Sequence, residues 1–403
     1  MREEEFGYLL FDKTDGNIFS INVKTNFPEE ITLKTPDGDI LIKKSDIHFF
    51  NTEPNDKGTL VGPTYVEIYP TLFCNERCTF CYVGDVLTKE VSAMNRVVID
   101  KVISNLKELG VFGVTILGGE PFLYKDLEYL VRELSKNNFA ITIATNGSVF
   151  KPDLYKIFTE LNVKLSVSLH SHIPSASNEI VRNSSTFAKT MESIRFLIKN
   201  CKPPHITIVL NNKNKGHITE TIEFLCKEGI KGISLFHTMN SGFAKENEAE
   251  GVSFTEYIRI FKAGKVIADH YGAKLTVTTN FPFLVDKSLN FNPNNENANL
   301  LFGTLEGRRS LYINYNGDVY PTAYDFGAPK LKLGNILKED LKKLWNSSSL
   351  LKEFRNANPP NICNSCMHFK YCRGGPITNY EIPYFRNKSI RMSCPLINVT
   401  SLE

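Results

Sequence analysis

The chain has 403 residues, of which 42% are hydrophobic and 23% charged, a composition typical of a soluble globular protein with one large core. Its 47 basic and 44 acidic residues nearly balance, so charge gives no indication of a nucleic-acid-binding surface. No apolar run approaches the roughly 18 residues of a membrane span, and the first residues lack the basic and apolar regions of a secretory signal. We therefore expect a cytoplasmic protein without nucleic-acid or membrane partners.

Residues 1–60 are predicted to form a small β-rich lobe, because short alternating or apolar stretches are separated by turn signals. From about residue 64, strands alternate with helices. The strand-like stretches are YVEIYP, GVTILGG, FAITIATN, KLSVSLH, HITIVLN and GISLFH, with helical patterns such as LEYLVRELSKNN between them. This order predicts an α/β fold, a partial (β/α)6 TIM-like barrel over residues 64–283. In such barrels, the active site lies at the C-terminal ends of the strands.

The remainder of the chain is predicted to form a separate cysteine-rich domain over residues 300–403. Residues 284–304 are polar and rich in asparagine, which indicates a connecting loop. A hairpin in LYINYNGDVYPT and a helix around LKKLWNSS follow this loop and precede the cysteines of the tail.

The positions of the cysteines indicate metal binding. An odd count of nine, without a secretory signal, argues against a disulfide framework, and short spacings in a reducing compartment more often mean metal. Cys201 and Cys226 stand apart and are interpreted as structural. The other seven form two groups: Cys74, Cys78 and Cys81, and Cys363, Cys366, Cys372 and Cys394.

The first group directly follows the first barrel strand. Three thiolates on one short loop can hold three irons of a four-iron, four-sulfur cluster and leave the fourth iron open to a small molecule. The alternatives are a zinc site or three thiols without metal, although zinc usually takes a fourth ligand close by.

This loop, with Phe80 before its last cysteine, resembles the signature loop of the radical S-adenosylmethionine superfamily. Matching features follow in the expected order over about residues 64–245. They are Gly118-Gly119-Glu120-Pro121 after the second strand, Thr145-Asn146-Gly147 after the third, Ser168 at the end of the fourth, and Arg182 after a loop. Each has an ordinary structural explanation by itself, such as a turn, a helix cap or a solvated charge.

The resemblance implies that S-adenosylmethionine binds beside the first cysteine group. In the family, the glycines allow a close approach of the backbone, and the glutamate receives the methionine amino group. The serine and the arginine hold the ribose and carboxylate region of the cofactor. The implied cofactor-binding residues are therefore Phe80, Gly118, Gly119, Glu120, Pro121, Asn146, Ser168 and Arg182.

The second cysteine group resembles the C-terminal cluster-binding extension called SPASM. A zinc ribbon is the competing interpretation, but the single downstream Cys394, in place of a second C-x2-C pair, favours a cluster. Thr322, Pro376 and the segment 304–307 stand where relatives carry the cysteines of an inner cluster. We therefore expect two 4Fe-4S clusters in total, one radical and one auxiliary. The auxiliary cluster, held by four thiolates, would handle electrons or structure.

The resemblance implies an enzyme that reductively cleaves S-adenosylmethionine to a 5′-deoxyadenosyl radical, which abstracts hydrogen from the substrate. Relatives with this tail mostly modify ribosomally made peptides, so we expect a peptide that acquires a thioether or carbon–carbon crosslink or another modification. An edge strand of the N-terminal lobe would capture a leader peptide, unless the lobe only shields the barrel. The expected electron donor is of flavodoxin or ferredoxin type.

No catalytic residue beyond the cluster and cofactor is required. Sulfatase-type maturation is disfavoured, because those enzymes carry an aspartate base where this chain has Ala323. Asp325 is close to that position but out of register, and is a secondary candidate for a base. Two alternatives stay open. One is an enzyme that modifies haem-pathway tetrapyrroles, and the other is a non-enzymatic iron–sulfur or zinc scaffold that binds a peptide.

Overall fold

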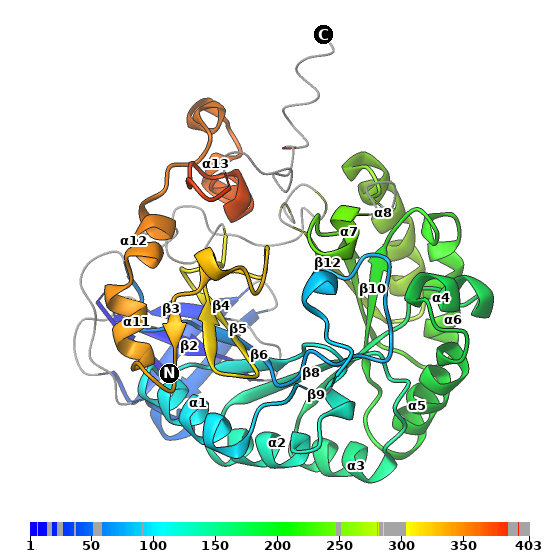
Figure 1. Cartoon of the computed structure of the whole chain (residues 1–403), viewed down its shortest axis with the longest axis horizontal. Coiled ribbons are helices and arrows are strands. Elements are labelled where there is room, and N and C mark those ends of the chain that lie inside the picture. The colour runs from blue at the N-terminus through cyan, green and yellow to red at the C-terminus, as the bar shows by residue number, and fades with distance from the viewer. Residues whose placement is uncertain are drawn as a thin grey trace.

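The computed structural model describes residues 1–5, 7–13, 18–21, 27–35, 38–50, 59–90, 92–246, 251–279, 281, 285, 304–385 and 394. A ten-stranded sheet dominates these residues (Figure 1). Its order is β12 (Lys274–Thr278), β11 (Gly232–His237), β10 (His205–Leu210), β9 (Lys164–Ser168), β8 (Ala140–Thr145), β7 (Gly113–Ile116), β6 (Tyr65–Tyr69), β13 (Ser310–Asn314), β14 (Asp318–Tyr320) and β15 (Gly334–Asn335). The strands from β12 to β13 are parallel, and the last two pairs are antiparallel.

The α/β barrel prediction is confirmed, and its six strands correspond to β6–β11. The sheet goes further than predicted, because β12 extends one edge and β13 pairs in parallel with β6 at the other. The predicted hairpin does form between β13 and β14. Its first strand also joins the barrel because Leu311 and Ile313 enter the same hydrophobic core as Val66 and Ile68.

Helices cover the outer face of the curved sheet (Figure 1). On α2 (Leu127–Lys136) the buried residues recur at helical spacing, so one apolar stripe faces the strands and the opposite face is polar. The other covering helices are α1 (Arg96–Glu108), α3 (Pro152–Glu160), α5 (Thr186–Asn200), α6 (Ile218–Lys227) and α8 (Phe254–His270). The short helices α4 (Pro174–Val181) and α7 (Phe243–Glu246) follow β9 and β11.

The inner face of the sheet is polar and partly exposed, unlike the core on its outer face. Hydroxyl side chains of neighbouring strands hydrogen-bond across it, at 2.8 Å between Ser166 and Thr207 and 2.8 Å between Ser234 and Thr276. Thr115 and Thr142 are likewise partly exposed on β7 and β8. The inside of the barrel therefore offers hydrogen-bonding groups to a ligand.

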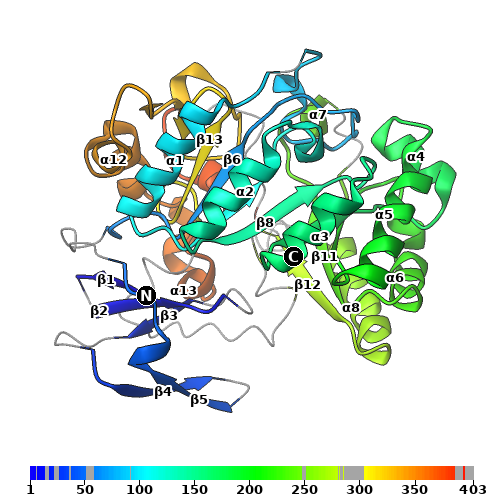
Figure 2. The same ribbon diagram turned by 90° about the horizontal axis from the view of Figure 1, so that it is seen from below.

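The N-terminal lobe is β-rich, as predicted. A three-stranded antiparallel sheet contains β1 (Arg2–Glu4), β2 (Gly7–Phe11) and β3 (Ile18–Ile21), and β4 (Glu30–Thr35) pairs with β5 (Gly38–Lys43) in a hairpin. Figure 2 shows these strands grouped on one side of the barrel, away from α4, α5, α6 and α8.

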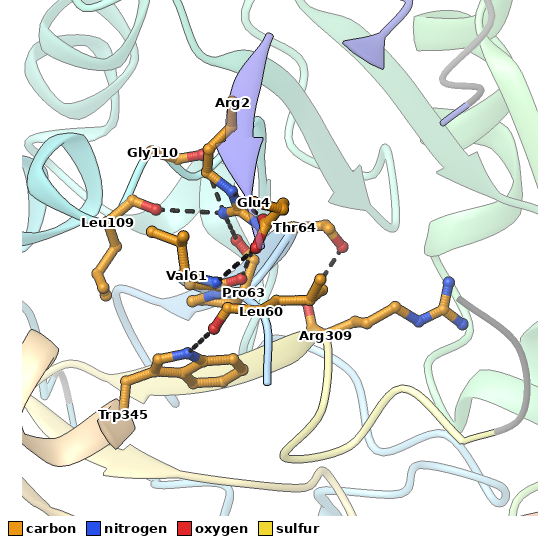
Figure 3. Close-up of polar contacts among 11 residues, drawn as sticks. Arg2, Glu4, Leu60, Val61, Pro63, Thr64, Leu109, Gly110, Arg309 and Trp345 are labelled. Atoms are coloured by element: carbon orange, nitrogen blue, oxygen red, sulfur yellow. Dashed lines mark hydrogen bonds and ion pairs between the residues drawn. The ribbon is translucent and has the colours of Figure 1, made fainter. Parts of the chain in front are cut away.

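A buried arginine joins the lobe to the barrel (Figure 3). The Arg2 guanidinium has no exposed surface, and it pairs with the Glu4 carboxylate at 2.7 Å. Glu4 in turn accepts a hydrogen bond from the Val61 amide at 2.8 Å. The remaining Arg2 donors bind main-chain carbonyls of Gly62, Pro63, Leu109 and Gly110.

The C-terminal part contains α11 (Leu341–Ser347), α12 (Ser349–Asn356) and α13 (Phe369–Cys372). The Trp345 indole of α11 donates to the Leu60 carbonyl at 2.8 Å (Figure 3). This hydrogen bond holds the helix against the segment that leads into β6. The predicted loop 284–304 lies outside the described residues except at positions 285 and 304. Among the helices described, none has the length and apolarity to cross a lipid bilayer.

Candidate active site

The first cysteine group lies on the loop that leaves the C-terminal end of β6. Cys74, Cys78 and Cys81 are partly buried and lie close enough for their charges to act on one another. Burial raises the pKa of all three thiols, and that of Cys81 reaches about 11. The three would therefore become thiolates only beside a strongly positive centre, which an iron–sulfur cluster supplies. A cluster binds one thiolate at each iron, so its ligands need not meet at one point. A site for a single zinc ion does require this, and no three His, Cys, Asp or Glu side chains of the described residues converge on one point.

Main-chain contacts fix this loop to α4. The Thr79 amide donates to the Ile180 carbonyl at 3.0 Å, and the Arg77 amide donates to the Val181 carbonyl at 3.1 Å. The Arg77 guanidinium also donates to the Cys74 carbonyl at 2.7 Å. Arg182, which ends α4 in the left-handed conformation at φ 53°, is therefore held beside the cysteine loop. Its predicted role in binding the cofactor stays a prediction.

The two glycines of the Gly118–Pro121 segment permit a close approach, here to the chain's own backbone. The Gly119 amide donates to the Thr71 carbonyl at 2.8 Å, and the Glu120 amide donates to the Phe73 carbonyl at 2.9 Å. A Cβ atom on Gly119 would lie 2.0 Å from the Phe73 oxygen. Gly118 has φ +123°, and a Cβ there would lie 2.3 Å from the Thr71 oxygen. The segment thus fixes the stretch that leads into Cys74.

Glu120 is almost fully buried, and its carboxylate accepts three hydrogen bonds. Oε1 accepts from the Thr145 hydroxyl at 2.6 Å and the Phe122 amide at 2.9 Å, and Oε2 accepts from the Asn146 amide at 2.8 Å. Burial raises the pKa of Glu120, whereas these bonds favour its ionised form. Because Oε2 takes one donor, it can accept another, as the expected contact with a methionine amino group requires.

Asn146 is linked to the cysteine loop through Asn75, a residue that sequence analysis missed. The Asn146 amide group donates to Asn75 Oδ1 at 2.9 Å, and the Asn75 amide group donates to Ser148 at 2.8 Å. The position of Asn75 inside the cysteine motif was the available signal. The end of β8 and the cysteine loop are thereby joined by side chains.

The other predicted cofactor residues lie at the ends of neighbouring elements. Ser168 ends β9 on its partly exposed inner face, in register with Thr207. The Phe80 ring packs edge-on against His170, two residues beyond Ser168, with 4.7 Å between ring centroids. Pro121 is buried at the start of a 3-10 turn. The structure thus assembles all the predicted positions around the C-terminal ends of β6–β9.

The second cysteine group also comes together. The charges of Cys366, Cys372 and Cys394 all act on Cys363, whose pKa burial raises to about 11. At two positions where the resemblance implies further cysteines, the buried Thr322 hydroxyl accepts a hydrogen bond from the Tyr324 amide, and Pro376 precedes a 3-10 turn. All nine cysteines are free thiols. Cys366, Cys372 and Cys394 are thus near enough to Cys363 for their charges to act on it, and their role as ligands of a second cluster stays a prediction.

Asp325 lies close to the cysteine loop in space. Its amide donates to the Ser241 hydroxyl at 3.3 Å, and its carboxylate accepts from the Tyr384 hydroxyl at 3.0 Å. The segment that carries Ser241 contacts the cysteine loop, because the Phe243 amide donates to the Cys81 carbonyl at 2.9 Å. Asp325 adopts φ +50°, unusual for a residue other than glycine.

A further group inside the barrel was not foreseen. Glu67 of β6 bonds to Tyr69, and Tyr69 bonds to Tyr82, the residue directly after Cys81. Tyr312 of β13 is paired in register with Glu67. The available signal was a charged residue at the centre of the strand YVEIY, where parallel strands are usually apolar.

Comparison with known families agrees with both cysteine groups. The sequence model of the radical SAM superfamily matches residues 68–225, which include the first group. The model of the SPASM iron–sulfur cluster-binding domain matches residues 305–367, which include Cys363 and Cys366 of the second. These domains imply 4Fe-4S clusters and S-adenosylmethionine binding.

Similar proteins include an AdoMet-dependent heme synthase of Methanosarcina barkeri, 24% identical over 75% of this chain and 88% of its own length. A probable GTP 3′,8-cyclase of Saccharolobus islandicus is 28% identical over 43% of this chain, and the match spans only 57% of the cyclase.

Solved structures show the same fold. SuiB of Streptococcus suis bound to S-adenosylmethionine gives a TM-score of 0.69 at 21% identity, covering 82% of this chain and 78% of its own. The protein anSMEcpe with bound AdoMet gives 0.62 at 18% identity, covering 80% and 94%. The family matches and the two cysteine groups lead to one conclusion: the chain belongs to the radical SAM superfamily, and it is a radical SAM enzyme with a SPASM iron–sulfur domain.

Proposed function

We propose that this enzyme uses S-adenosylmethionine to abstract hydrogen from a peptide and so crosslinks or otherwise modifies it. The observation that carries the proposal is a triplet of thiols on one loop, with no fourth cysteine beside them among the described residues, next to the Gly118–Pro121 segment. Support for a peptide comes from the neighbouring structures, since SuiB was solved bound to its precursor peptide SuiA and anSMEcpe with a Cp18Cys peptide.

The chain's residues would divide the work in a defined way. Cys74, Cys78 and Cys81 would hold the radical cluster, which supplies, together with S-adenosylmethionine, one-electron chemistry when bound. Glu120 Oε2 would accept a hydrogen bond from the methionine amino group, and Arg182 would pair with the cofactor's carboxylate. The hydroxyls on the inner face would orient the substrate.

Asp325 would act as the base in this scheme. After hydrogen abstraction, the substrate would lose a proton to this carboxylate and an electron to the auxiliary cluster, and the Tyr384 hydroxyl would hold the carboxylate in place. The four tail thiols would hold a second cluster without an open iron, suited to carrying electrons. A flavodoxin- or ferredoxin-type protein would deliver the initial electron, in the cytoplasm.

The N-terminal lobe would capture a leader peptide. Among the described residues, β3 pairs with β2 on one side only, so its other edge can accept an added strand. The Arg2 contacts keep this lobe fixed on the barrel, so a captured leader would hold the peptide at a constant place relative to the cysteine loop.

The test is the iron and sulfide content of anaerobically reconstituted protein, together with the formation of 5′-deoxyadenosine from S-adenosylmethionine. The parent should hold about eight irons, and a variant with Cys74, Cys78 and Cys81 changed to alanine about four. Only the parent should produce 5′-deoxyadenosine. A parent that holds zinc in the tail, or that does not consume S-adenosylmethionine, would contradict the proposal.

A tetrapyrrole substrate is the second candidate, because the heme synthase match spans most of both chains. The structure adds an observation that favours it. Arg309 is half-buried, its Nε atom has no hydrogen-bond partner among the described residues, and Glu306, whose charge acts on it, does not come within 4.0 Å to form an ion pair. A carboxylate-bearing tetrapyrrole would supply that partner. Substrate-dependent 5′-deoxyadenosine formation with a dicarboxylate porphyrin, lost in Arg309→Gln, would select this candidate over a peptide.

A further inference from the structure

Glu67 is a charged residue at the centre of a barrel strand. Its neighbours Val66 and Ile68 are fully buried in the core between the sheet and the helices. Side chains alternate along a strand, so Glu67 points to the inner face, where it is partly exposed. Because β6 leads directly into the cysteine loop, Glu67 lies on the strand that also positions the radical cluster.

Tyrosines surround this carboxylate. The Tyr69 hydroxyl donates to Glu67 Oε2 at 2.8 Å, and the Tyr69 and Tyr82 hydroxyls are 2.8 Å apart. Tyr69 and Tyr312 are buried, whereas Glu67 and Tyr82 are partly exposed. Tyr69 is itself covered by Phe326, which stacks on it with 4.3 Å between ring centroids. The exposed part of the group therefore belongs to Glu67 and Tyr82.

The charge of Glu67 is not balanced within the described chain. No lysine, arginine or histidine nitrogen forms an ion pair with it within 4.0 Å, and Oε1 accepts no hydrogen bond. The charge that acts on it is that of Glu306, which has the same sign. Burial and this neighbour raise the pKa of Glu67 to about 7, although the Tyr69 hydrogen bond opposes the rise. A cation from outside the chain would remove this penalty.

We propose that Glu67 and Tyr82 form a subsite for a cationic group of the substrate, the ammonium of a lysine or the guanidinium of an arginine side chain. Glu67 Oε1 forms the charge-assisted hydrogen bond, and the Tyr82 ring adds a cation–π contact. Because Tyr82 follows Cys81, the subsite holds the basic residue next to the radical cluster. The inference rests on the proposed peptide function and deepens it, since it requires a basic residue at or beside the modified position.

Calorimetric titration of the reconstituted holoenzyme tests the subsite. The probe is N-acetyl-lysine methylamide, and the neutral comparison is the same compound acetylated on its side-chain nitrogen. We expect the charged probe to bind and the neutral one to bind at least about tenfold more weakly. Glu67→Gln should weaken the charged probe by a similar factor, whereas Glu67→Asp, which keeps the charge, should lose less.

Glu108→Gln is the matched control, because Glu108 is exposed at the end of α1 and lies outside the barrel interior. Equal binding of the charged and neutral probes, no binding of either, or unchanged binding in a folded Glu67→Gln variant would overturn the inference. If Glu67→Gln does not fold, the difference between the two probes on the parent decides. Formation of 5′-deoxyadenosine by the parent is measured separately, so its absence would refute the proposed function and leave the binding result intact.

Discussion

The side-chain amide of Asn146, at the end of β8, donates a hydrogen bond to Oδ1 of Asn75 inside the cysteine motif at 2.9 Å. The same Asn75 side chain donates to Ser148, so two hydrogen bonds join the loop that holds the thiols to the next strand but one. The cysteine loop and the end of β8, where we expect the cofactor to bind, are therefore positioned together.

Replacing Asn75 with alanine should loosen the radical cluster without unfolding the barrel. The variant loses both side-chain bonds, each worth about 1 kcal/mol, while the main-chain bonds of the loop to α4 remain. We expect faster loss of the visible cluster absorbance when a chelator is added. Ser45→Ala, which removes an exposed hydroxyl in the N-terminal lobe, is the control, and equal rates in both variants would contradict this role.

Replacing Gly119 with alanine should lower the stability and the iron content of the protein far more than replacing Gly216 with alanine. A Cβ on Gly119 would lie 2.0 Å from a main-chain oxygen that cannot move aside without displacing the cysteine loop. We expect Gly119→Ala to cost about 1–3 kcal/mol and to lower iron content by about one cluster. At Gly216 nothing lies within 4 Å of an added Cβ, so Gly216→Ala should retain both properties. Melting temperature and iron content of the two variants decide the matter.

The buried His170 should make stability fall in acid. Its Nδ1 accepts a hydrogen bond from the Val209 amide, and burial lowers its pKa from 6.5 to about 3. Because the pKa of His170 is lower in the folded chain, the unfolded chain becomes protonated at this residue once the pH falls below 6.5, whereas the folded chain stays unprotonated. Protonation therefore favours the unfolded state. The contribution of His170 is therefore complete above pH 6.5 and declines between 6.5 and 3, by on the order of 1 kcal/mol per pH unit.

The measurement is urea unfolding at pH 7 and pH 5 for the parent and for His170→Gln. We expect the stability of the parent to fall more steeply than that of the variant over this interval. The comparison cancels the carboxylates, which titrate in both proteins. Parallel slopes would show that His170 is already protonated, or that it titrates alike in the folded and unfolded chain.

Much of the fold could be predicted because its signals are local. The strands β6–β11 are short apolar or alternating runs separated by helical patterns, and each formed where expected. The parallel pairing of β13 with β6 joins residues about 245 positions apart, and nothing local in the sequence specifies a partner at that distance. The burial of Arg2 was equally invisible, because its partners are main-chain carbonyls, which any residue provides.

The candidate site could be predicted where a motif repeats a family pattern and not where it depends on packing. The first cysteine loop, the Gly118–Pro121 segment and Asn146 were predicted from such motifs, and they contact one another in the structure. The contact of the two glycines with residues 71–73 was not foreseen, because it depends on how the cysteine loop folds back across the end of β7. Glu67 was overlooked because one charged residue does not cancel the apolar signal of its strand.

The Arg2–Glu4 pair provides the last prediction, on the attachment of the N-terminal lobe. Arg2→Met should leave the Glu4 carboxylate buried without its cation and four carbonyls without a donor, at a cost of about 3–5 kcal/mol. The double variant Arg2→Met with Glu4→Leu should be less destabilised than the single one, because no charge remains buried.

Lys44→Met, which breaks an exposed pair with Glu29 at 3.3 Å, is the control and should cost about 1 kcal/mol or less. Urea unfolding of the three variants measures these differences, and a single Arg2 variant as stable as Lys44→Met would mean that the lobe is held by its apolar contacts alone.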